Sequence, residues 1–140
     1  MARPIERTSA SDYLLALLRL VSALLFFSHG LVKMAAFPPG APPGLQPIAS
    51  LDGLAGLIEL LAGILLAIGW LTRPAAFLAS GTMAAAYWIG HAPQGFFPVA
   101  NGGDSSILFC FVFLYLAAAG AGPYSIDNRR GKPAAEKAGG

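Results

Sequence analysis

The chain has 140 residues, of which 56% are hydrophobic and 11% are charged, and its formal net charge is +2. Its mean hydropathy is +0.63, whereas an ordinary soluble domain has about 25% charged residues. This composition excludes a water-solvated globular domain and indicates a membrane protein. The small net charge gives no support for nucleic-acid binding, and a single cysteine, Cys110, excludes a disulfide or a thiolate metal site within one chain.

Four apolar segments each approach the roughly 20 residues that cross a hydrocarbon core of about 30 Å. Strands are disfavoured because an open sheet cannot hydrogen-bond its edges in lipid. The predicted fold is therefore all-α, an integral membrane four-helix bundle formed by one domain at residues 13–127. Its helices are expected at about residues 13–36, 52–71, 74–91 and 104–121.

Lysine and arginine gather on one side of these predicted helices. That side holds a tail at residues 1–12, the connection at Arg73 and a basic tail at residues 128–140, whereas the other side holds only Lys33. Because lysine and arginine collect in cytoplasmic segments, both termini should be cytoplasmic. The C-terminal tail is expected to be disordered and to touch anionic lipid, so the bilayer is the first expected partner.

The first predicted helix carries a line of polar residues. Arg19, Ser22, His29 and Lys33 share one helix face with Phe26 at three-and-four spacing. A charged side chain at the centre of a membrane helix costs roughly 2.5–3.5 kcal/mol on insertion scales, so an ionisable residue there is a functional-site hypothesis. This face should point into the bundle.

The second predicted helix repeats this pattern with an acid. Asp52, Gly56, Glu59 and Gly63 are spaced by four, three and four residues. Small residues let membrane helices approach closely, so this face should pack against another helix. Glu59 is therefore expected inside the bundle.

Counting the rise of 1.5 Å per residue places His29 about 24 Å from the inner side and Arg19 about 9 Å from it. Arg19, the residue nearer the cytoplasmic side, is expected to form an ion pair with Glu59. Tyr87 should line the wall of an outer site. The ionisable residues expected to converge at that site are His29, Lys33, Glu59, His91 and Asp104.

Several interpretations of this cluster stay open. In a structural one, Glu59 pairs with Arg19 or His29, and Lys33 extends to the outer headgroups. In a ligand-binding one, His29 or His91 donates to the carbonyl of a quinone-type molecule and Glu59 handles a proton. A metal site, a bis-histidine haem site and a transport path are further alternatives, and the last would require a homo-oligomer.

Five motifs follow one another along the chain. They are Leu18-Arg19-Leu20, Phe26-Phe27-Ser28-His29-Gly30-Leu31-Val32-Lys33, Gly56-Leu57-Ile58-Glu59-Leu60-Leu61-Ala62-Gly63, Pro98-Val99-Ala100-Asn101-Gly102-Gly103-Asp104 and Gly120-Ala121-Gly122-Pro123-Tyr124-Ser125-Ile126-Asp127. Together they resemble the DoxX family of small four-helix bacterial membrane proteins. The similarity covers roughly Tyr13 to Asp127, and Asp104 stands where the family usually has glutamate after Asn101, Gly102 and Gly103, the motif of the outer loop.

The resemblance implies an inner-membrane protein, and the family is named after a membrane subunit associated with thiosulfate:quinone oxidoreductase. We therefore expect an accessory subunit of a membrane redox complex that receives electrons from soluble or membrane redox partners. We expect no cofactor or metal in the chain itself, a quinone as the candidate bound molecule, and we assign no reaction. The alternative is a non-catalytic assembly or chaperone-like protein whose polar residues only fix helix packing.

Overall fold

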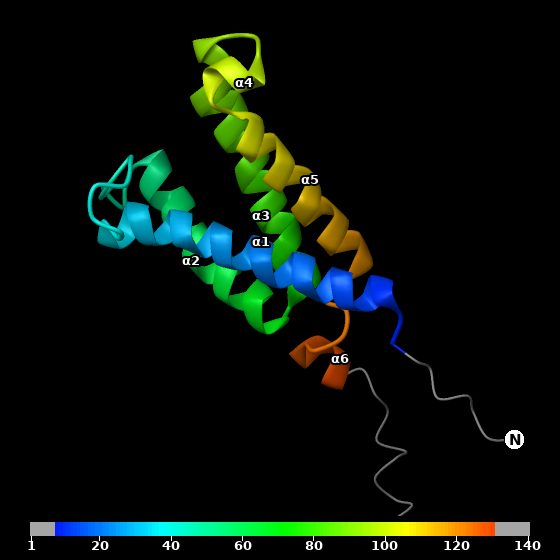
Figure 1. The fold of residues 1–140 in the computed structure, drawn as a ribbon. Helices are drawn as coiled ribbons and strands as arrows, with labels where there is room; N and C mark the ends of the chain where they lie inside the picture. Colours follow the sequence, from blue (N-terminus) through cyan, green and yellow to red (C-terminus); the bar gives the residue numbers. More distant parts are fainter. Residues whose placement is uncertain (1–7, 131–140) are drawn as a thin grey trace, which may run out of the picture.

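The computed structural model describes residues 8–130, and every regular element in that range is helical (Figure 1). This confirms the all-α prediction for the described part of the chain. Most of the two predicted tails, residues 1–7 and 131–140, lies outside it. The elements are α1 (Ala10–Ala35), α2 (Leu51–Ile68), α3 (Thr72–Ala86), the π-helical turn η1 (Tyr87–His91), the 3-10 turn η2 (Ala92–Gln94), α4 (Pro98–Asn101), α5 (Asp104–Ala119) and α6 (Ile126–Arg130).

Local capping sets the ends of the first two long helices. α1 begins at Ala10, earlier than the predicted residue 13, because Ser9 and Asp12 form a reciprocal capping box in which the Ser9 amide donates to Asp12 Oδ2 at 2.8 Å. The Ser50 hydroxyl accepts from the amide of Gly53 at 3.0 Å at the start of α2. α2 ends before the predicted residue 71 because Gly69 adopts a left-handed conformation with φ of 68°.

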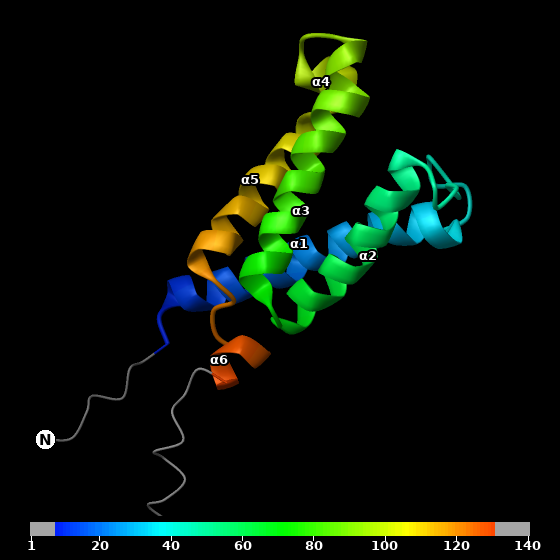
Figure 2. The same cartoon turned by 180° about the vertical axis from the view of Figure 1, so that it is seen from behind.

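The four long helices form two antiparallel hairpins, α1 with α2 and α3 with α5, as Figures 1 and 2 show from opposite sides. The hairpins cross at an angle and separate toward the ends that carry the α1–α2 loop and α4. They meet where α2 turns into α3, and the start of α1, the end of α5 and α6 lie at this same end. The described residues thus form two inclined hairpins that meet at one end.

The core lies where the two hairpins cross. The Phe26 ring of α1 meets the edge of the Phe113 ring of α5 with a centroid distance of 4.7 Å, and both side chains are fully buried. Alanines dominate the rest of this core, which lets the helix backbones approach closely. The buried alanines of the cluster are Ala23, Ala62, Ala75, Ala76 and Ala79.

The outer surface of both hairpins is covered by large apolar side chains. α1 and α2 are each long and apolar enough to cross a membrane, and α5 is a shorter apolar helix. Apolar residues exposed on every long helix are the surface expected of helices that face lipid. Examples are Leu17, Leu24, Leu61, Phe77 and Phe111.

Candidate functional site

A buried ion pair joins α1 to α2. Lys33 Nζ lies 2.7 Å from Glu59 Oε1, and the side chains of Lys33 and Glu59 are only 13% and 2% exposed. The second carboxylate oxygen, Glu59 Oε2, is buried and has no hydrogen-bond partner among the described residues. The pair therefore has one free acceptor at a site shielded from solvent.

Glycines hold the two helices close enough for this contact. A Cβ added to Gly56 would lie 2.8 Å from Lys33 Cβ, and one added to Gly30 would lie 2.8 Å from Leu60 Cγ and 2.9 Å from the Gly56 oxygen. Because real Cβ atoms do not approach so closely, any larger residue would push the helices apart. The expected close packing along the Glu59 face of α2 is confirmed.

The predicted ion pair between Arg19 and Glu59 is wrong. Arg19 is 2% exposed, and its Nη1 donates to the carbonyl oxygens of Leu66 at 2.8 Å and Ala67 at 3.1 Å, whereas its Nη2 donates to that of Tyr124 at 3.1 Å. Its Nε is buried and has no hydrogen-bond partner in the part of the chain that the structure describes. The C-terminal end of a helix carries partial negative charge, so the carbonyl oxygens at the end of α2 stabilise this guanidinium.

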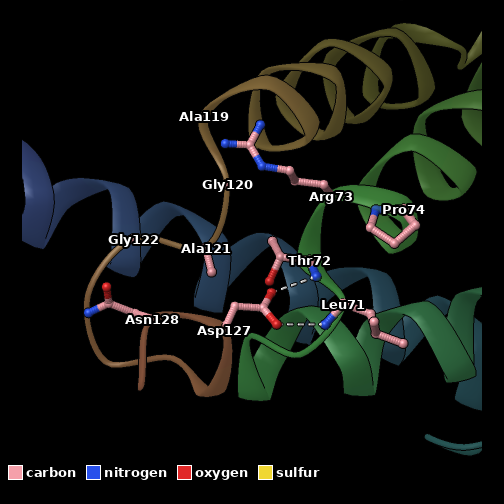
Figure 3. A pocket seen from close by; sticks show the side chains of 10 residues that line it. All are labelled: Leu71, Thr72, Arg73, Pro74, Ala119, Gly120, Ala121, Gly122, Asp127 and Asn128. Carbon is pink, nitrogen blue, oxygen red and sulfur yellow. Dashed lines mark hydrogen bonds between the residues drawn. The ribbon is translucent and has the colours of Figure 1, made fainter. Parts of the chain in front are cut away.

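The segment after α5, residues 120–130, runs across the end where the hairpins meet, and we call it the strap. The amides of Leu71 and Thr72 donate to the Asp127 carboxylate at 3.0 and 2.9 Å (Figure 3). The Asp127 amide donates to the Gly69 oxygen at 2.9 Å. Asp127 thus caps α3, whose own preceding residue supplies no side-chain cap. Sequence reasoning missed this role, although the last motif of the resemblance ends at Asp127.

The strap also sets the protonation behaviour of its acid. Burial alone would raise the pKa of Asp127, but the hydrogen bonds from Thr72 and Leu71 and the charge of Arg130 together hold this pKa below its ordinary value. Asp127 is therefore ionised at neutral pH, which is the form that accepts both amide hydrogens.

A second polar cluster lies at the far end of the α3–α5 hairpin. The Asn101 side chain donates from Nδ2 to the Gly95 oxygen at 2.8 Å and accepts the Gly103 amide at 2.8 Å, and its backbone oxygen lies 3.1 Å from His91 Nδ1. A Cβ on Gly103 would lie 2.6 Å from the ring of Tyr87, so only glycine fits under that ring. The outer loop motif thus forms a compact hydrogen-bonded turn around Asn101.

Of the five ionisable residues expected to converge, Lys33 and Glu59 are in contact, but His91 and Asp104 do not join them in the described structure. Lys33 and Glu59 lie on the α1–α2 hairpin, whereas His91 and Asp104 lie on the other hairpin, at its separated end. Asp104 is exposed, and its Oδ1 accepts only the neighbouring amide of Ser105. Depth counting gives positions along the membrane normal, and it cannot detect that the hairpins diverge sideways.

His29 occupies an intermediate position. It is exposed, lies one turn before Lys33 on α1, and sets the edge of its ring against Phe109 of α5 with centroids 6.1 Å apart. It therefore stands where the first hairpin contacts α5. Within residues 8–130, no three histidine, cysteine, aspartate or glutamate side chains lie close enough together to hold a metal ion.

The fold and these sites describe a small helical protein whose surface is suited to lipid and which buries two charged side chains, Arg19 and Glu59, between the helices of its described part. The DoxX family model matches residues 14–92. An uncharacterized protein of Haemophilus influenzae is 42% identical over 121 residues, covering 84% of this chain and 90% of that relative. No solved structure matches.

The chain belongs to the DoxX family, as the motifs indicated. Because this is a membrane family and two helices have the length and composition of membrane spans, the chain is a small membrane protein. The matched residues include the Lys33–Glu59 pair and the residues that Arg19 contacts at the end of α2.

Proposed function

We propose that this protein is a multi-pass inner-membrane protein in which all four long helices cross the bilayer and both termini lie in the cytoplasm. The support is the distribution of charge over the fold. Arg73, Arg129 and Arg130 lie at the end where the hairpins meet, and Lys33 is the basic residue at the opposite end of the α1–α2 hairpin. Basic residues favour the cytoplasmic side.

Within that membrane protein, the Lys33–Glu59 pair is the proposed site of ligand binding. The proposed function of the protein is that of an accessory subunit of a membrane redox complex. The single observation that carries this proposal is Glu59 Oε2, a buried carboxylate oxygen without a hydrogen-bond partner among residues 8–130. A buried unpaired acceptor costs about 1–3 kcal/mol, more when charged, and a ligand hydroxyl would remove that cost.

A quinone-type molecule fits this donor set. Its quinol form presents a hydroxyl that can donate a hydrogen bond to Glu59 Oε2. Its quinone form presents a carbonyl oxygen that can accept a hydrogen bond from the Lys33 ammonium. When bound, such a molecule supplies two-electron redox chemistry. The chain would bind and orient it, keep water from it, and hold a proton at Glu59, whereas electrons would come from a partner protein.

The test is extraction of lipophilic molecules from protein purified in mild detergent, followed by mass spectrometry. Wild type is expected to retain a quinone, and Glu59→Gln and Lys33→Met are expected to lose it. Asp52→Asn is the matched control, because Asp52 is an exposed acid of the same helix. Retention of quinone by Glu59→Gln would place the binding site elsewhere, and a wild-type protein without quinone or a redox partner would refute the accessory role.

Orientation is tested separately with reporter fusions at residue 45, in the α1–α2 loop, and at the C-terminus. The two reporters are expected to lie on opposite sides of the membrane. A cytoplasmic residue 45 would contradict the proposed topology without bearing on ligand binding.

A second candidate function is a non-catalytic assembly protein, and one observation favours it. Arg19, the most deeply placed cation of the polar face, binds three backbone carbonyls and so ties α1 to α2 and to the strap. In that case Glu59→Gln would lower the amount of folded protein in membranes instead of removing a ligand. Quantifying membrane-inserted protein for each variant separates the two functions.

A further inference from the structure

An open groove of about 530 Å³ lies between the strap, the start of α3 and the end of α5 (Figure 3). Arg73 and Asp127 stand on its two sides, and the backbone of Gly120 and Gly122 forms part of its wall. This groove is distinct from the Lys33–Glu59 pair, which lies between α1 and α2. In the proposed orientation it opens at the cytoplasmic surface of the membrane.

Arg73 is held in place while part of its guanidinium group stays free. Its Nη1 donates to the carbonyl oxygens of Ala117, at 3.0 Å, and Ala118, at the C-terminal end of α5. Its Nε and Nη2 have no acceptor among residues 8–130, and the side chain is exposed. Two adjacent N–H groups of a fixed guanidinium match the oxygens of a phosphate in a bidentate contact.

The charges around the groove favour an anion. Both oxygens of Asp127 accept amide hydrogens at the N-terminus of α3, where the helix dipole offsets the negative charge. Arg129 and Arg130 on α6 are exposed and add positive charge, and the Arg130 guanidinium lies 5.7 Å from the ring centroid of Trp70. Tryptophan is typical of the membrane–water interface.

The rim of the groove is apolar. Leu71, Pro74 and Ala119 line it and are exposed, and they continue into the apolar outer surface of α3 and α5. A molecule with a phosphate group and hydrocarbon chains matches both parts of this surface, since the phosphate can meet Arg73 while the chains follow the helices into the lipid.

We propose that this groove binds the headgroup of a membrane phospholipid, with the phosphate held by Nε and Nη2 of Arg73. The proposal rests on the membrane orientation given under the proposed function. It is independent of the quinone site, because none of the residues that line the groove contacts Lys33 or Glu59 in the described structure. Free inorganic phosphate shares the recognised group, so the experiment must separate the two sources.

Native mass spectrometry of the detergent-purified full chain, titrated with phosphatidylglycerol, measures the affinity for the lipid directly. Arg73→Gln is expected to weaken lipid retention at least about tenfold, equivalent to about 1.4 kcal/mol. Arg129→Gln is the matched control, because it removes the same charge from the same end of the molecule outside the groove lining. It is expected to retain lipid within about twofold of wild type, a difference of less than 1 kcal/mol.

Arg73 also caps α5, so its loss can affect folding as well as binding. Ala119→Phe is the second variant, since it fills the apolar rim without removing any hydrogen bond of Arg73, and it should also weaken retention. Equal loss in Arg129→Gln would refute the proposal in favour of diffuse charge attraction. Full lipid retention by Ala119→Phe, or stabilisation of the folded protein by inorganic phosphate alone equal to that by the lipid, would also overturn the proposal. A reporter result against the proposed topology, with lipid binding intact, would contradict only the orientation.

Discussion

Replacing Asp127 by alanine should destabilise the protein at neutral pH by releasing the strap from the start of α3. The carboxylate accepts two amide hydrogens, from Leu71 at 3.0 Å and Thr72 at 2.9 Å. Losing a helix-capping side chain costs about 0.5–2 kcal/mol, and losing a negative charge at a helix N-terminus costs about 0.3–1 kcal/mol more. We therefore expect a loss of about 2 kcal/mol in the free energy of unfolding.

The conservative variant refines this expectation. Asp127→Asn keeps one side-chain oxygen and loses the charge, so it can accept one of the two amide hydrogens and should lose about 1 kcal/mol. The matched control is Asp52→Asn, since Asp52 lies in the first turn of α2 and has no side-chain hydrogen bond in the described structure. Its loss should stay below about 1 kcal/mol, which is the dipole contribution alone.

The effect of Asp127→Ala should depend on pH in a defined direction. Because the pKa of Asp127 is lowered in the folded state, its stabilising contribution is complete above the pKa of about 3.9 expected in the unfolded chain. It is lost as the pH falls through the lowered folded-state pKa. The difference in stability between wild type and Asp127→Ala should therefore be constant from pH 7 to about pH 5 and shrink at lower pH.

The assay is chemical or thermal unfolding in mild detergent, followed by tryptophan fluorescence, because Trp70 contacts Arg130 of the strap. Asp127→Ala with wild-type stability at pH 7 would refute the capping role. A stability difference that stays unchanged down to pH 3 would show that the carboxylate charge does not take part, and the effect would then belong to packing alone.

Two further predictions concern the α1–α2 hairpin. Lys33→Met should lower the free energy of unfolding by about 3–5 kcal/mol because it leaves Glu59 as an uncompensated buried charge, whereas the double variant Lys33→Met/Glu59→Gln should regain most of that loss. A double-mutant cycle in the same unfolding assay measures this coupling, and additive losses would contradict the ion pair. Gly56→Ala should lower the free energy of unfolding by about 1–3 kcal/mol through overpacking against Lys33. Gly81→Ala, with open space around its Cβ position, should instead stabilise α3 by about 0.5–1 kcal/mol. Equal effects of the two glycine variants would argue against close packing at Gly56.

The sequence allowed part of this arrangement to be predicted. Glycines at three-and-four spacing beside Glu59 indicated a buried acid on a closely packed helix face, and the structure has both. Depth counting placed Lys33 level with Glu59, as the structure has it, but it could not decide which cation is the partner of the acid. The actual register of α1 against α2 follows from the contacts of Gly30 and Gly56, which bring Lys33 alongside Glu59. Spacing within one helix carries no information on that register.

The strap and the divergence of the hairpins were harder to predict for a related reason. Asp127 caps a helix that begins 55 residues earlier in the chain, so no local pattern around Thr72 reveals the interaction. Apolar periodicity also treats each span separately, and it cannot distinguish a closed bundle from two hairpins that meet at one end. The angle between them is set by tertiary contacts such as those of Phe26 with Phe113.

The two ends of the polar face of α1 have different chemical environments, which separates the contacts of the fold from the proposed ligand site. Near the end where the hairpins meet, the charge of Arg19 is met by three carbonyl oxygens, so a change there removes contacts within the fold. Toward the α1–α2 loop, Glu59 uses one oxygen for Lys33 and leaves the other buried, with no hydrogen-bond partner among residues 8–130. A purely structural pair gains nothing from that arrangement, since two apolar residues of similar volume would avoid the cost of the unpaired oxygen. The proposed binding of a ligand at Glu59 would account for an acid at this position, whereas the contacts of Arg19 belong to helix packing.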